Sequence, residues 1–387
     1  MRAKWLFVGL VTILLCNVRV ISQTHYLPSD LIFPVEDLQG NQTSLMRIDA
    51  QTMSAVEFYS EPSTVISLQG LKWSPDGRKL AIARRTETTL VQVCVLNRDG
   101  LMQQCMAETT SFAATLDSLM WSDDGKRLYF AVQKYISPSD EMTARLIEAD
   151  ALTGQTIRIL HEVPNVNYTL TYVWNADLSS VLIGNMEGRR ASQAPLLQLF
   201  RFTEVLQAPS QIDILSTIPI YRFMYLCRQA SPSGMFFAFI EGDERSVLGN
   251  AITIVDTQGK LVVRIDSLLG ASKIDVTCPV WSWNEEALYF LAGKTGEPLA
   301  LVKYSLIEHS ATLYYQPPEN TFGEPIKGLN PPYALSYDNG WIAGRQYVYR
   351  DGPTWQVAVL GPNGEYHTFL GNWRSAGFPL WMPPLDE

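Results

Sequence analysis

The sequence predicts an all-β protein built from one repeated unit. Short apolar segments separated by turn signals run through the chain after Gln23, and no segment has convincing helical periodicity. A turn motif also returns: residues 71–83 read LKWSPDGRKLAIA, and residues 119–130 read LMWSDDGKRLYF. A pattern that returns at a nearly fixed spacing indicates one structural unit used many times.

Each copy of the motif reads as two strands joined by a tight turn. Pro75 presets φ at the first central turn position, and Asp76 is accepted at the next. Gly77 takes the positive φ that a bulkier residue resists. Because Asp76 and Asp124 recur with the turn, we interpret them as turn residues and not as catalytic acids. The repeated tryptophan is interpreted as a wedge between neighbouring units.

The spacing of the motif predicts the architecture. Aligned copies place the anchor aromatic position at Trp73, Trp121, Trp174, Ala230, Trp281, Tyr337 and Trp381, in steps of 48, 53, 56, 51, 56 and 44 residues. A period near 50 with four strands per unit is typical of a β-propeller blade. In the second unit the strands are expected at residues 119–121, 128–132, 144–149 and 155–160.

The two ends of the chain complete the ring. Residues 379–383 read as a lone first strand, and residues 30–35, 44–49 and 53–58 supply the other three strands of the same blade. Such closure leaves no free edge between the first and last blades. The expected fold is one propeller domain over residues 23–387 with seven four-stranded blades. Six blades are the alternative, because the fourth and sixth copies of the motif are degenerate.

The turn and its flanking strands resemble the TolB-type propeller repeat, a relative of the WD-repeat family, whose core reads W-S-P-D-G-x-x-L-A-F. Residues 73–77 with Leu80 and Ala81 match it at nearly every position, and residues 121–130 come close. The resemblance implies a β-propeller and little about function, because the motif is structural. TolB propellers have six blades and a separate N-terminal domain, whereas this sequence predicts seven blades and no such domain.

Composition and the N-terminus bear on the compartment. The net charge of −9 argues against nucleic-acid binding, which needs clustered Lys and Arg. Arg2 and Lys4 precede an apolar run over residues 5–16, and residues 20–22 (VIS) offer a cleavage site. We expect a signal peptide over residues 1–22 and an exported protein, secreted or periplasmic in the cell envelope. An uncleaved membrane anchor is the alternative.

Export would make disulfides available to four of the five cysteines. Cys94 and Cys105 flank the turn at residues 97–100 and are expected opposite each other across a two-residue Asp-Gly loop, whereas a three-residue loop would shift the register by one. Cys227 and Cys278 occupy equivalent places in two repeats and are the second candidate pair. Four free buried thiols are the alternative.

No catalytic motif is found. The chain has no G-x-S-x-G elbow, P-loop, GxGxxG or CxxC, so we expect no catalytic residues, cofactor or metal site. The four histidines, His25, His161, His309 and His367, are expected far apart, as surface or filler residues.

The loops indicate where a partner would bind. Connections between the second and third strands of a blade, and between blades, are long and irregular, whereas the other turns are short. We predict a protein or small-ligand partner on this face, with contacts by Arg85, Tyr135, Arg189, Arg190 and Glu244. Ordinary solvated loop residues are the alternative. The functional alternatives are a lyase or hydrolase acting on a glycan or peptide at the channel mouth, and an anchored structural component of the envelope.

Overall fold

The computed structural model is made of strands and turns. It describes residues 27–37, 42–61, 65–85, 91–110, 119–136, 141–163, 170–174, 181–185, 196–202, 212–219, 229–241, 249–256, 260–268, 270–277, 279–295, 299–316, 330–349, 353–369, 371, 373 and 375–385. Within these ranges no helix is long and apolar enough to span a membrane.

The strands form sheets whose pairings are antiparallel except for one between β27 and β29, and most sheets follow the order of the chain. The first group is β4 (Val65–Trp73), β5 (Lys79–Arg85), β6 (Val91–Asn97) and β7 (Met102–Thr110). The second is β8 (Met120–Trp121), β9 (Arg127–Ile136), β10 (Glu141–Asp150) and β11 (Thr156–Val163). Two two-stranded sheets follow, β12 (Leu170–Trp174) with β13 (Val181–Asn185), and β14 (Leu196–Phe202) with β15 (Ile212–Pro219).

The second half of the chain repeats the arrangement. A four-stranded sheet holds β16 (Gln229–Ala230), β17 (Phe236–Glu241), β18 (Ala251–Asp256) and β19 (Leu261–Ile265). A five-stranded sheet holds β20 (Ile274–Val276), β21 (Val280–Trp281), β22 (Ala287–Lys294), β23 (Ala300–Ser305) and β24 (Ser310–Tyr315). The last, nine-stranded sheet holds β25 (Asn330–Leu335), β26 (Ile342–Tyr349), β27 (Pro353–Leu360), β28 (Tyr366–Phe369), β29 (Ser375–Ala376), β30 (Leu380–Trp381), β1 (Leu31–Glu36), β2 (Thr43–Ile48) and β3 (Ala55–Tyr59).

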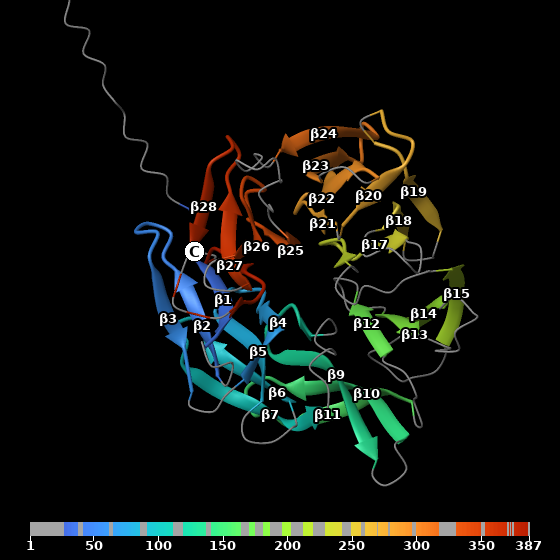
Figure 1. Ribbon diagram of the computed structural model, residues 1–387. Helices are drawn as coiled ribbons and strands as arrows, with labels where there is room; N and C mark the ends of the chain where they lie inside the picture. Colours follow the sequence, from blue (N-terminus) through green and yellow to red (C-terminus); the bar gives the residue numbers. More distant parts are fainter. Residues whose placement is uncertain are drawn as a thin grey trace, which may run out of the picture.

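These groups stand side by side around a ring, as Figure 1 shows. The first strand of each group, such as β4, β12, β21 and β25, lies toward the middle, and the last, such as β7, β15, β19 and β24, lies at the rim. The predicted all-β propeller is confirmed. The number of blades stays a prediction, because β12–β15 form two separate two-stranded sheets in the described residues.

The ring closes through strands from both ends of the chain. Leu31 of β1 lies opposite Trp381 of β30, and Ile32 lies opposite Leu380. β1 pairs in turn with β2, and β2 pairs with β3. The predicted closure by one C-terminal and three N-terminal strands is therefore confirmed. In addition, β29 pairs with both β1 and β27 and so joins the last two groups into one sheet.

The anchor turn forms as the residues predict, and its geometry corrects one alignment. Gly77 has φ 65° and its N–H donates to the Ser74 carbonyl oxygen at 2.9 Å. In the sixth copy Asn339, with φ 57°, donates to the Ser336 carbonyl oxygen at 2.8 Å. Asparagine tolerates this left-handed conformation, so Asn339 replaces the turn glycine. The anchor position is therefore Leu335, two residues before the Tyr337 that the alignment predicted.

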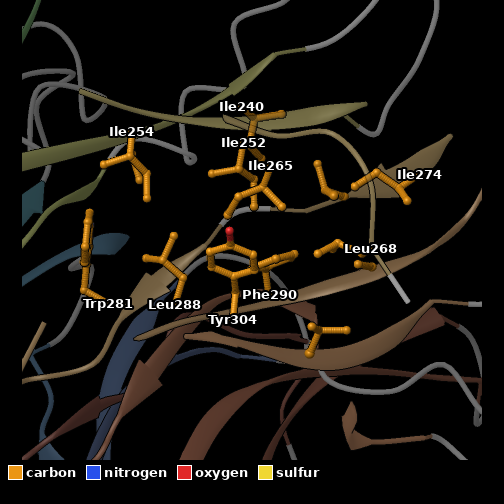
Figure 2. Packing of buried hydrophobic residues seen from close by; sticks show 14 residues of the cluster. Ile240, Ile252, Ile254, Ile265, Leu268, Ile274, Trp281, Leu288, Phe290 and Tyr304 are labelled. Atoms are coloured by element: carbon orange, nitrogen blue, oxygen red, sulfur yellow. The ribbon is translucent and has the colours of Figure 1, made fainter. Parts of the chain in front are cut away.

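The hydrophobic core lies between neighbouring sheets. Figure 2 shows one interface, in which isoleucines of β17–β19 face aromatic and aliphatic side chains of β21–β23. The labelled residues of this interface are Ile240, Ile252, Ile254, Ile265, Leu268, Ile274, Trp281, Leu288, Phe290 and Tyr304, all at most 7% exposed. Full burial of each large apolar side chain contributes roughly 1.5–3 kcal/mol, so each sheet is stabilised by its neighbours.

The repeated tryptophans join sheet to sheet. The indole Nε1 of Trp121 donates to the Lys72 carbonyl oxygen of the preceding sheet at 3.0 Å. Trp281 stacks on Phe236 of the preceding sheet, with ring centroids 6.2 Å apart. These contacts agree with the interpretation of the anchor tryptophan as a wedge.

A disulfide joins Cys94 of β6 to Cys105 of β7. The two residues lie directly opposite each other, as predicted, but the turn is not the predicted two-residue loop. The Asn97 N–H donates to the Leu101 carbonyl oxygen, which leaves a three-residue loop and shifts the register by one. A bulge at Gln103 then restores the facing register. Cys227 and Cys278 lie outside the described residues.

Candidate functional site

The ring has two faces with different construction. The face that carries the turns at residues 74–78, 122–126, 231–235, 282–286 and 336–340 is called the turn face. The opposite face, at which the second strands end with Arg85, Ile136, Glu241 and Tyr349, is called the loop face.

The polar residues of the turn face serve the turns themselves. The Ser122 hydroxyl donates to the Asp124 carboxylate at 2.7 Å, and the Lys126 N–H donates to the same carboxylate at 3.0 Å. The hydrogen bond from Ser122 holds the pKa of Asp124 below its usual value. Ser74 and Asp76 repeat this arrangement. A carboxylate committed to its own turn is a poor acid–base catalyst.

Further contacts tie neighbouring turns together. The Ser233 hydroxyl donates to the Glu285 carboxylate at 2.8 Å, and the Trp283 N–H donates to the Asn339 side-chain oxygen at 2.7 Å. The Arg98 guanidinium donates to the carbonyl oxygens of Gly77, at 2.6 Å, and Pro383, at 2.8 Å. The turn face is thus largely occupied by internal hydrogen bonds.

The loop face holds the described part of the predicted binding set. Arg85 is exposed, but it is the last residue of β5, paired with Val65, and not a loop residue. Tyr135 lies within β9 opposite Met142, because β9 and β10 extend through most of the loop expected at residues 134–142. These two positions are corrections to the loop assignment. Arg189, Arg190 and Glu244 lie outside the described residues.

An interior arginine near the loop face was missed by sequence reasoning. The Cζ of Arg345, in β26, lies 4.6 Å from the ring centroid of Trp355 and 3.9 Å from that of Phe378. Its Nε is buried without a hydrogen-bond partner. Burial lowers the pKa of Arg345 to about 10. No sequence signal could have assembled this group, because its three residues come from β26, β27 and the segment before β30.

A second unforeseen residue lies on the innermost strand β4. The residue is exposed at the surface, but desolvation of its ammonium group lowers the pKa of Lys72. The direction follows from desolvation, which disfavours the charged form.

The described residues contain no group of three or more His, Cys, Asp and Glu side chains that could hold a metal ion. Three histidines belong to three different sheets: His161 is in β11, His309 lies in the turn between β23 and β24, and His367 is in β28. His25 lies outside the described residues. These three histidines are therefore not brought together.

No family model matches the chain, and no curated protein matches its sequence. Solved structures match its fold. The β-propeller domain of the Trilobed protease from Pyrococcus furiosus, described as having an open velcro topology, is 11% identical with a TM-score of 0.56, over 89% of this chain and 95% of that one. An oligogalacturonate lyase in complex with manganese is 13% identical with a TM-score of 0.54, over 87% and 83%.

TolB from Acinetobacter baumannii is 12% identical over 92% of this chain and 67% of that one, with a TM-score of 0.47, and nothing further is inferred from it. At these identities the likenesses show the fold alone. The chain is a β-propeller protein, and the fold-level resemblance to propeller repeats is confirmed. A propeller hosts many functions, so function has to be argued from the site.

Proposed function

We propose that this protein is an exported, non-catalytic binding module that engages a protein or small-ligand partner through its loop face. The observation that supports it is the contrast between the two faces. On the turn face, side chains such as Asp124, Glu285 and Arg98 are committed to the fold. On the loop face, Arg85 is exposed at the end of a rigid strand, where a partner could reach it.

Export is supported by two observations. The Cys94–Cys105 disulfide is typical of proteins that fold in an oxidising compartment. The basic start and apolar run of residues 1–16 have the pattern of a signal peptide. N-terminal sequencing of the exported protein tests this part: a start at residue 23 supports cleavage, and an intact residue 1 supports the anchored alternative.

The binding proposal is tested by capture from the protein's native extracellular or envelope fraction. Arg85→Glu changes the loop face, and the double reversal Arg189→Glu/Arg190→Glu changes two residues that the sequence predicts to contact the same partner. Arg78→Glu changes an exposed arginine on the turn face and is the matched control. We expect saturable binding of a partner. The affinity for this partner should fall at least tenfold in the arginine-reversal variants and stay unchanged in the control. Equal retention by all variants would show that the loop face does not carry the interaction.

Lys72 favours an enzyme as the second candidate function. Desolvation lowers the pKa of Lys72, which is the direction of shift that a general-base or nucleophilic lysine needs. The oligogalacturonate lyase among the similar structures suggests one substrate class to screen, acidic oligosaccharides. Turnover lost in Lys72→Met and kept in Lys260→Met, an exposed lysine at the rim, would favour the enzyme over the binding module.

A further inference from the structure

We propose that the Arg345 guanidinium is a binding site for a carboxylate group of a ligand. The inference deepens the proposed function, on which it rests, by naming a ligand chemistry for the loop-face half of the ring. Arg345, Trp355 and Phe378 are each half-buried, so the group is held by the fold and still reaches solvent.

Other arginines of the described residues show what the fold normally provides. Arg84 forms an ion pair with Glu61 and donates to the Tyr59 hydroxyl at 3.1 Å. Arg127 and Arg158 both pair with the fully buried Glu148. These arginines have a carboxylate partner supplied by the fold.

Further arginines follow the same rule. Arg264 pairs with Glu241 and Asp266, and Arg98 donates to two backbone carbonyl oxygens. Among the half-buried arginines whose side chains the structure describes, Arg345 alone has neither a carboxylate nor a carbonyl acceptor.

An unpaired cation withdrawn from water is costly, and the cost falls when an anion pairs with it. The rings of Trp355 and Phe378 offset part of the cost through cation–π attraction, but an aromatic ring accepts no N–H hydrogen bond of ordinary strength. The fold supplies the Nε of Arg345 with no acceptor, while two rings hold the guanidinium in position. This is the arrangement of a preorganised anion site.

The charge of the site selects the anion. The guanidinium carries one positive charge, and no second described cation is paired with it or with its two rings. A carboxylate balances one charge and matches the planar fork of arginine with two parallel hydrogen bonds. A phosphate dianion would leave a negative charge in partly apolar surroundings. We therefore assign the site to a carboxylate.

The direct test observes the Arg345 Nε–H resonance by ¹H–¹⁵N NMR while sodium acetate is the probe. Chloride at equal ionic strength and inorganic phosphate are the comparison anions. The resonance is assigned by its loss in Arg345→Lys. We expect a saturable shift with acetate and at least tenfold weaker responses with chloride and phosphate. No saturable shift, or equal shifts with all three anions, would overturn the assignment. The variant serves only to assign the resonance, and the titration itself is carried out on the wild-type protein.

The variants provide the second readout, the rise of the melting temperature with acetate relative to chloride. Arg345→Gln should weaken the apparent acetate affinity at least tenfold, and Arg345→Lys should weaken it severalfold because the planar fork is lost. Arg78→Gln removes the same charge from the turn face and should keep the wild-type response. An unchanged acetate response in a folded Arg345→Gln would overturn the proposal.

Three further outcomes separate the hypotheses. Asp351 lies outside the described residues, close to Arg345 in sequence. If acetate raises the melting temperature of Asp351→Asn and not that of the wild type, Arg345 has an internal partner and the proposal is wrong. If capture identifies a loop-face partner but acetate has no effect, the carboxylate site fails and the proposed function stands. If acetate binds and no partner depends on Arg85, Arg189 or Arg190, the site stands and the protein-binding face fails.

Discussion

The indole Nε1 of Trp381 donates a hydrogen bond to the carbonyl oxygen of Ala334, 2.9 Å away, and so ties the last strand of the chain to β25. Trp381 is also paired with Leu31 across the β30–β1 ladder and is only 1% exposed. The side chain of Trp381 thus joins the C-terminal strand β30 to β25, while its backbone joins β30 to the N-terminal strand β1. The stability of the closed ring should depend strongly on this residue.

Trp381→Ala should lower the free energy of unfolding by about 3–5 kcal/mol, the usual cost of emptying a buried aromatic site. Urea unfolding followed by far-UV circular dichroism measures it. Trp283→Ala is the control. Because Trp283 is 44% exposed, its replacement should lower the free energy of unfolding by less than half as much. Equal losses in the two variants would show that ring closure does not depend on Trp381.

Removal of the disulfide should destabilise the first sheet. Cys94→Ala with Cys105→Ala should cost about 2–4 kcal/mol, because the cross-link restricts the unfolded chain. Unfolding with and without dithiothreitol measures the effect. Reduction should lower the stability of the wild type and leave that of the double variant unchanged. Insensitivity of the wild type to a reductant that demonstrably opens the bond would contradict this account.

Asp124 should make the stability depend on pH in acid. The pKa of Asp124 in the folded state lies below its usual value, chiefly because of the Ser122 hydrogen bond. Its contribution to the folding stability is therefore complete above the unfolded pKa near 3.8 and is lost as the pH falls through the folded pKa. The stability difference between wild type and Asp124→Asn should be constant from pH 5 to 7 and shrink below pH 4. Urea titrations at each pH measure it, with Asp123→Asn as the control of equal charge. A difference that grows in acid would reverse the predicted sign.

Glu148 should be essential to the second sheet. Its side chain is fully buried between Arg127 and Arg158, so Glu148→Gln leaves two arginines without their carboxylate. We expect the free energy of unfolding to fall by about 2–4 kcal/mol. This is toward the lower end of the usual cost of breaking a buried ion pair, because both arginines are partly exposed. Glu162→Gln breaks the exposed pair with Arg145 and should cost at most about 1 kcal/mol. A similar small cost for both variants would show that Glu148 contributes no more than a surface charge.

Much of the fold could be predicted because its signals are local. The turn at residues 74–78 is specified by its own residues. Ser74 and Asp76 form its side-chain hydrogen bonds, and Gly77 takes the positive φ. The misplaced sixth anchor shows the limit of this reasoning. Gly340 follows Asn339 directly, and sequence alone does not decide which of them takes the left-handed turn position; the hydrogen bond from Asn339 to Ser336 does.

The candidate site was predicted less well than the fold. Arg85 and Tyr135 lie at the loop side of the ring, but each belongs to a strand whose pairing continues beyond its expected end. The length of a strand depends on how far it pairs with its partner strand, and the sequence of one strand alone does not specify this.

The sequence by itself determined the all-β class, the repeat, the turn chemistry and the closure of the ring, because each depends on residues close together in the chain or on a regular period. Only the tertiary structure decided that Arg345 lies between Trp355 and Phe378 without a carboxylate partner. The physical reason is that a charge is balanced by whatever the packing places beside it. For Arg345 these neighbours come from the next strand and from the C-terminal segment, which ring closure brings to its side.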